Sequence, residues 1–132
     1  MGTIFGAIQA GTLTALDLSF NGGLLFRINS LGDAPVAANT NPQGFWIGTR
    51  TGPSAVSVYR NGNAIASSTT PSSGVPALSM YLCASNLDGV PNFFVGDQVS
   101  AFFIGGGLNA AQASNLSSRI NGFMTALGAN VY

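Results

Sequence analysis

Residues 54–63 read Ser-Ala-Val-Ser-Val-Tyr-Arg-Asn-Gly-Asn and constrain the fold more than any other part of the chain. Val56 and Val58 alternate with polar or amphipathic residues, which is the period of a strand with one aliphatic face. The dipeptide Asn61-Gly62 tolerates the two positive φ angles of a type I′ turn. Small apolar residues then carry the chain back. The sequence therefore predicts a β-hairpin here, and with it a sheet.

The same period of two recurs along the chain and predicts further strands. We expect a second hairpin over residues 16–28, strands at 44–50 and 78–84, and a long strand within 93–104. The last of these is apolar on both faces, which predicts a strand buried on both sides at the middle of the assembly. Residues 29–43, 67–74 and 85–92 are rich in turn formers and are interpreted as loops.

The end of the chain changes to a helical period. Leu116, Ile120, Phe123 and Leu127 recur at spacings of four, three and four, which places them on one face of a helix. Asn109 is a suitable N-cap, and Gln112 and Gly128 stand where a capping box and a C′ glycine are expected. The sequence predicts one helix over residues 109–127, with its apolar stripe against a sheet or a neighbouring chain.

Charge is scarce and balanced, since the chain has four Asp, four Arg, and no Lys, Glu or His. A net charge near zero gives no basic stripe for nucleic acid and little protection against self-association. No apolar run is long enough to predict membrane insertion, and no signal peptide is recognisable. At 132 residues, one domain is expected. Residues 1–11 carry no charge and no clean period, and they are interpreted as a possible arm that reaches a neighbouring copy.

Catalysis finds few candidates in this composition. Nucleophilic Ser-His or Cys-His chemistry requires a His, and glycoside hydrolysis normally requires two positioned carboxylates, whereas the four Asp are scattered. Cys83, the only cysteine, is interpreted as a small buried hydrophobe in a strand. We expect no enzyme activity and no cofactor.

Two features could hold an ion. Asn86, Asp88, Asn92 and Asp97 supply oxygen atoms that calcium accepts. Asn-x-Asp-Gly is also ordinary turn chemistry, and the turn interpretation is preferred, so no metal site is predicted. The three glycines at 105–107 precede a helix and could cradle an anion, but strand-to-helix geometry explains them better because the Lys of a phosphate loop is missing.

Carbohydrate binding requires exposed aromatic rings with polar partners close by. The candidate ligand-binding residues are Trp46, Arg50, Tyr59, Tyr81 and Asn86. The alternative is that the three aromatic residues pack at the sheet faces, and this alternative is preferred.

From residue 44 onwards the chain resembles the C-terminal half of concanavalin A-like, or laminin G-like, jelly-roll domains. The residues that carry the resemblance are Tyr-Arg-Asn-Gly, then Leu-Ser-Met-Tyr-Leu-Cys-Ala-Ser-Asn-Leu-Asp-Gly, then Val-Ser-Ala-Phe-Phe-Ile-Gly-Gly-Gly-Leu-Asn-Ala-Ala-Gln, and a closing helix ending in Ala-Leu-Gly. The combination is similar to domains of virus and bacteriophage structural proteins and of some bacterial surface proteins. The resemblance implies an all-β, antiparallel jelly-roll-type β-sandwich with one C-terminal α-helix.

Two departures from the family pattern affect what we expect. Only some forty residues precede the first matched strand, so the fold is reduced, the chain is part of a longer protein, or neighbouring subunits complete the sheets. The acidic pair of the related glucanases is missing, because the chain has no Glu.

The resemblance and the composition together lead to one expectation about function. We expect a non-enzymatic structural module of a virion or surface appendage, located on the virion or at an extracellular surface. We expect a homo-oligomer, with three copies as the preferred number, in contact with other virion or appendage proteins. The alternative is a lectin-like module that binds host or cell-surface glycans.

Overall fold

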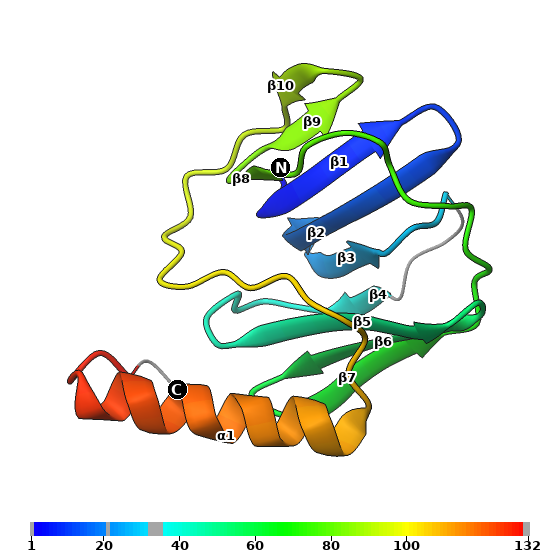
Figure 1. Cartoon of the computed structure of the whole chain (residues 1–132). Coiled ribbons are helices and arrows are strands. Elements are labelled where there is room, and N and C mark those ends of the chain that lie inside the picture. The colour runs from blue at the N-terminus through cyan, green and yellow to red at the C-terminus, as the bar shows by residue number, and fades with distance from the viewer. Residues whose placement is uncertain (1, 21, 32–35, 131–132) are drawn as a thin grey trace.

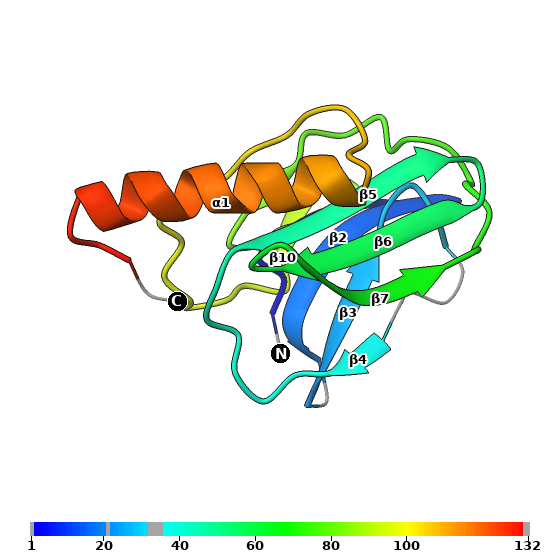
Figure 2. The same ribbon diagram turned by 90° about the horizontal axis from the view of Figure 1, so that it is seen from below.

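The computed structural model describes residues 2–20, 22–31 and 36–130 and arranges them as two sheets and one helix (Figure 1). Sheet A runs in the order β10-β9-β1-β2-β3-β4, with β8 also paired to β1, and sheet B runs β5-β6-β7. Helix α1 lies on the side of sheet B that faces away from sheet A (Figures 1 and 2). The fold is therefore mostly β, a sandwich with one C-terminal helix. The bounds of sheet A are β1 Phe5–Gln9, β2 Thr12–Phe20, β3 Gly23–Arg27, β4 Val36–Ala38, β8 Tyr81–Leu82, β9 Ser85–Leu87 and β10 Val90–Asn92; those of sheet B are β5 Trp46–Gly52, β6 Ala55–Arg60 and β7 Asn63–Ser68.

The predicted hairpin is confirmed and forms the middle and one edge of sheet B. Arg60 pairs with Asn63, and the two residues between them have the positive φ angles of a type I′ turn, 50° at Asn61 and 82° at Gly62. The turn also touches the helix. A Cβ atom on Gly62 would lie 3.3 Å from Cα of Ser114 and 3.4 Å from Cβ of Ser117. Small residues on this side of α1 thus allow the hairpin end to approach it closely.

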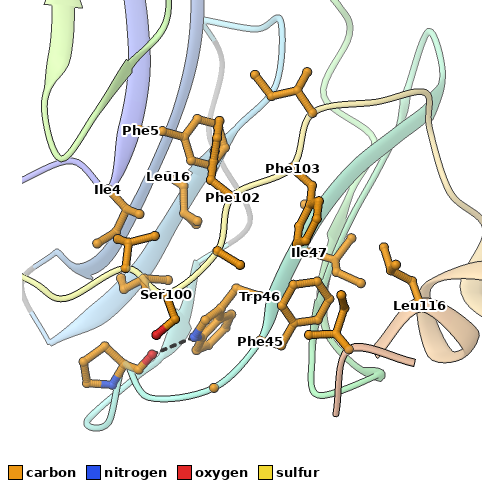
Figure 3. Close-up of a pocket in the computed structure, with 18 of the residues that line it drawn as sticks. Ile4, Phe5, Leu16, Phe45, Trp46, Ile47, Ser100, Phe102, Phe103 and Leu116 are labelled. Carbon is orange, nitrogen blue, oxygen red and sulfur yellow. Dashed lines mark hydrogen bonds between the residues drawn. The ribbon is translucent and has the colours of Figure 1, made fainter. Parts of the chain in front are cut away.

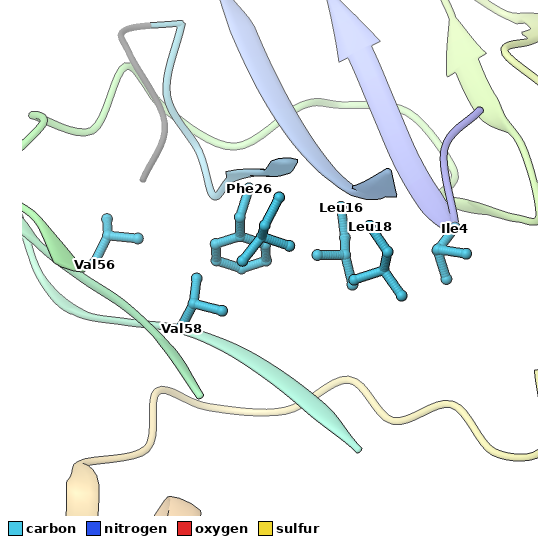
Figure 4. Packing of buried hydrophobic residues seen from close by; sticks show 7 residues of the cluster. Ile4, Leu16, Leu18, Phe26, Val56 and Val58 are labelled. Carbon is cyan, nitrogen blue, oxygen red and sulfur yellow. The ribbon is translucent and has the colours of Figure 1, made fainter. Parts of the chain in front are cut away.

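The space between the sheets is filled by aliphatic side chains and one aromatic ring. Val56 and Val58 of β6 face Phe26 of β3 across the sandwich, and Phe26 is 1% exposed (Figure 4). Leu24 of β3 belongs to the same buried cluster. Gly48 of β5 lies under the Phe26 ring, because a Cβ atom there would stand 1.5 Å from Cζ of Phe26. The absence of a side chain at residue 48 therefore lets the two sheets close on this ring.

The helix was also predicted correctly in extent and capping. It spans Ala110–Ala126, and the side chain and backbone of Asn109 exchange hydrogen bonds with Gln112 in a capping box. At the other end Gly128 has φ 67°, and the amides of Gly128 and Ala129 donate to the carbonyls of Thr125 and Met124. These two bonds make a Schellman motif.

Only part of the predicted apolar stripe is covered. Leu116, the first residue of the stripe, packs with Ala113 against the cluster of Ile47 and Tyr59 on sheet B, and α1 then continues past the sheet (Figures 1 and 2). Phe123 and Leu127 are 60% and 63% exposed. No helix in the described part of the chain is long and apolar enough to cross a membrane.

Several predictions of strands and loops were wrong. Within the predicted arm, Phe5–Gln9 form β1, which lies between β2 and β9 inside sheet A, where Ala7 is 1% exposed. Because β1 is covered on both edges and both faces, its sequence does not need to alternate between apolar and polar residues. The predicted loop 29–43 contains β4. Sheet A is also not purely antiparallel, since β1 pairs with β9 in parallel.

The third quarter of the chain differs most from prediction. The strand expected at 78–84 shrinks to the two residues of β8, and Cys83 follows it with φ 60° and a half-buried side chain. Residues 85–92, which were predicted as a loop, instead form a hairpin in which β9 and β10 pair around the turn Asp88-Gly89. Both turn residues have positive φ, 48° and 94°.

The long buried strand expected within residues 93–104 is absent. In the described chain, residues 93–109 contain no helix or strand, and they cross from sheet A to the start of α1 (Figure 1). Phe94, Phe103 and Ile104 are 69%, 57% and 70% exposed. We call residues 97–107 the crossing segment.

The Asn61-Gly62 turn generates a test that separates backbone strain from packing. Gly62→Val should destabilise the fold by about 2 kcal/mol or more, because valine resists positive φ and its methyl groups would meet Ser114 and Ser117. Gly89→Val is the matched control, since Gly89 has a similar φ but no atom within 4 Å of its Cβ position. Urea denaturation midpoints should fall further for Gly62→Val. Equal losses in the two variants would show that the helix contact contributes nothing.

Candidate functional site: a cavity beside strand β5

One cavity of about 660 Å³ lies where the sandwich opens along β5 (Figure 3). Three parts of the fold enclose it: the inner face of sheet A, β5 with the loop before it, and the crossing segment with the middle of α1. Its volume is within the range of small-molecule sites. The apolar wall includes Ile4, Phe5, Leu16, Leu18, Phe45, Trp46, Ile47, Phe102, Phe103, Ile104, Leu116, Ile120 and Met124.

The exposed polar side chains lining this cavity come from two separate loops. Asn41 and Gln43 precede β5, whereas Asp97, Gln98 and Ser100 begin the crossing segment. They supply amide, hydroxyl and carboxylate groups beside an apolar interior. Such a site suits a neutral ligand that has both apolar surface and hydrogen-bonding groups.

Trp46 is the one predicted ligand-binding residue that lines this cavity. Its indole Nε1 donates a hydrogen bond of 2.8 Å to the carbonyl of Pro42, and the guanidinium of Arg60 lies 5.1 Å from the ring centroid. Arg60 in turn donates to the carbonyl of Gln43 at 2.5 and 3.0 Å. This cation–π pair fixes the loop before β5 and leaves the indole half-buried.

The other four predicted ligand-binding residues lie outside the lining of this cavity. Tyr59 lies on the face of sheet B that α1 covers, is 7% exposed and belongs to the same buried cluster as Ala113. Tyr81 lies in β8, in sheet A. Asn86 is 3% exposed; its Nδ2 donates to the carbonyl of Ser79, and its Oδ1 accepts from the amide of Gly89. None of these three lines the cavity.

Arg50 donates hydrogen bonds to four backbone carbonyls from three stretches of chain. It donates to the carbonyl of Ile28 at 2.9 Å, of Pro53 at 2.7 Å and of Thr70 at 3.1 Å, with a longer bond of 3.4 Å to Gly52. Burial lowers the pKa of its guanidinium, which remains charged at any physiological pH. Arg50 is thus a structural clamp between β5, β3 and the connection after β7.

Two of the calcium candidates, Asn86 and Asp88, belong to one turn. The Asn86 side chain caps the turn at Asp88-Gly89. Asn92 accepts a hydrogen bond from the amide of Phe93, and Asp97 lies at the cavity. No group of three or more Cys, Asp, Glu or His side chains that could hold a metal occurs among the residues described.

Asp17 is a buried carboxyl that the sequence did not single out. It is 7% exposed on β2, and burial raises the pKa of this carboxyl above its ordinary value of 3.8; a hydrogen bond from Thr3 and the charge of Arg27 oppose the rise. Its Oδ1 has no hydrogen-bond partner in the described chain.

The crossing segment is what sequence reasoning missed at the cavity. The apolar run predicts a buried strand within residues 93–104, whereas in the structure Gln98 and Ser100 line the cavity together with Trp46. The available signal was the cluster Asp97-Gln98 before the apolar run, which is polar enough to stay near solvent. Comparison with family models, curated proteins and solved structures finds no match to this chain.

The raised pKa of Asp17 generates a test by pH. A carboxyl whose pKa is higher in the folded state than in the unfolded state contributes stability that is fully present below pH 3.8 and is lost as the pH rises through the folded pKa. The free energy of unfolding of the wild type should therefore decrease as the pH rises above 3.8. Asp17→Asn should abolish the contribution of Asp17 to this decrease, as measured by urea denaturation at several pH values. Asp97→Asn, which removes one exposed carboxyl, is the control for the loss of a negative charge. Identical profiles for Asp17→Asn and wild type would contradict the assignment.

Proposed function

We propose that this protein is a non-enzymatic structural module that functions within a larger assembly, as a virion or surface-appendage component. The observation that carries the proposal is the uncovered half of α1. Phe123 and Leu127 are mostly exposed, and Arg119 is the only charged residue in the helix. Exposed apolar faces of this kind mark interaction sites.

The sheets give the same proposal a second support. The edge strands are β10 and β4 in sheet A and β5 and β7 in sheet B. Proteins that stay monomeric commonly protect such edges with charged residues, above all Lys, and this chain has neither Lys nor Glu. We propose association with further copies of the chain, three as the preferred number, and a sandwich of the jelly-roll type that the sequence resemblance implies.

Solution mass tests the assembly proposal. The wild-type chain should be an oligomer by light scattering at micromolar concentration, and the double variant Phe123→Ser/Leu127→Ser should shift it towards the monomer by about tenfold or more in dissociation constant. Val75→Ser is the matched control, because Val75 is 73% exposed but lies in the connection after β7. A wild-type monomer, or equal effects of the helix and control variants, would refute the proposal.

A second function has one specific observation in its favour. Trp46 lines a cavity whose polar groups include three amides and one carboxylate, from Asn41, Gln43, Gln98 and Asp97. An aromatic ring beside directional polar groups is the combination that glycan binding requires. This supports a lectin-like alternative at the cavity, with a glycan of host or cell surfaces as ligand.

The single tryptophan makes the glycan alternative easy to test. Binding beside Trp46 should change the intrinsic fluorescence during titration with neutral oligosaccharides, and Asp97→Asn with Gln98→Ala should weaken binding about tenfold. Asn63→Ala, which alters an exposed amide on β7, is the control. No fluorescence change up to millimolar sugar would exclude the lectin-like function.

A further inference from the structure

The outer edge of β5 faces the cavity without a partner strand. The amide of Asn61 donates to the carbonyl of Phe45, so residue 45 directs its backbone groups towards the β6 side. Because these groups alternate along an antiparallel strand, Trp46 and Gly48 direct theirs to the opposite, open side. Both residues line the cavity. A row of backbone donors and acceptors in an apolar cavity is suited to one kind of occupant, an extended peptide.

The crossing segment already lies beside this edge and runs in the same direction. The rings of Phe103 and Phe45 have centroids 6.3 Å apart, and at the far end a Cβ atom on Gly107 would lie 2.3 Å from the carbonyl oxygen of Arg50. Residue numbers therefore rise together along the two stretches. In the described chain, no backbone hydrogen bond connects residues 97–107 to β5.

The side chains of the crossing segment alternate as they would in a strand. Phe102 contacts Phe5 of sheet A with ring centroids 5.0 Å apart, whereas the next residue, Phe103, contacts Phe45 on the side of the helix (Figure 3). In β5 the same division holds, with Trp46 packed towards sheet A and Ile47 towards α1. Both stretches thus direct alternate side chains towards sheet A and towards α1.

The far end of the segment is held in place. The amide of Leu108 donates to Thr49 Oγ1 at 2.7 Å, and that hydroxyl donates to the carbonyl of Leu108 at 3.1 Å. Thr49 is 4% exposed. This reciprocal pair fixes the chain next to β5, so a ladder can grow from this end with little further loss of chain entropy.

We propose that the β5 edge is a strand-acceptor site and that its occupant is this chain's own residues 103–107. When they pair in parallel with β5, sheet B gains a fourth strand and the cavity narrows. The structure then represents the open form of a strap. In the open form Phe103 and Ile104 are exposed and the cavity is accessible. On closure these two side chains become less exposed, the cavity becomes less accessible, and residues 103–107 form backbone hydrogen bonds with β5.

Two adjacent glycines provide a matched pair of variants. Gly105 and Gly106 lack positive φ, and a Cβ atom at either would meet no atom within 4 Å. In a strand paired on one edge, alternate amides face the partner, so only one of Gly105→Pro and Gly106→Pro removes a ladder hydrogen bond. The other proline faces outward and is tolerated.

The readout is amide hydrogen exchange at Trp46 and Gly48, with the amide of Val58 in the β6–β7 hairpin as the check that the fold is intact. In the wild type the Gly48 amide should exchange about tenfold or more slowly than an unstructured peptide, and one proline variant alone should abolish this protection. Exchange at the unstructured rate in the wild type, or equal effects of the two prolines, would overturn the proposal.

Dilution distinguishes the occupant. Protection of Gly48 that is independent of protein concentration supports pairing within one chain. Protection that disappears on dilution would mean that a second copy supplies the strand, and it would overturn the proposal as stated. The assembly proposal has a separate readout, since it rests on solution mass and on variants of Phe123 and Leu127, so either proposal can fail without the other.

Discussion

The contact between Phe26 and Gly48 sets the distance between the two sheets. A ring that is 1% exposed fills the space that any side chain at residue 48 would occupy. Closing the sandwich on this ring directs the other face of sheet B outwards, where Ile47 and Tyr59 need cover. Helix α1 supplies that cover through Ala113, and the small residues of its first half let the hairpin end approach. Sheet A therefore positions sheet B through Phe26, and sheet B positions α1 through Ile47 and Tyr59.

Local signals in the sequence predicted what local physics determines. The Asn61-Gly62 turn, the capping box at Asn109 and the C′ glycine at Gly128 depend on neighbours within a few residues, and all three are found in the structure. The failures concern strands whose identity depends on distant partners. An apolar run such as residues 99–104 has the same period whether or not an edge is paired to it, so the pattern alone could not reveal the crossing segment.

The candidate site was predictable only in part for the same reason. Trp46 is identifiable because aromatic residues near polar ones are visible in a sequence, but the second group of polar residues at the cavity comes from a loop some fifty positions later. Arg50 and Asn86 have the side chains of ligand-binding residues, yet both make hydrogen bonds to backbone groups of the fold. A sequence shows that a side chain can donate or accept, but it does not show which distant backbone groups the side chain will bond.

The placement of β1 has a consequence for how the chain folds. Its parallel partner β9 follows the whole of sheet B in the sequence, so Gly6 and Ser85 meet only when a very long loop is closed. Loop closure of this kind is slow compared with hairpin formation. During synthesis the first strands can form a meander at once, but one edge of β1 stays open until β9 has left the ribosome. For that interval the nascent chain presents an uncharged strand edge, which is a target for chaperones or for premature contact between chains.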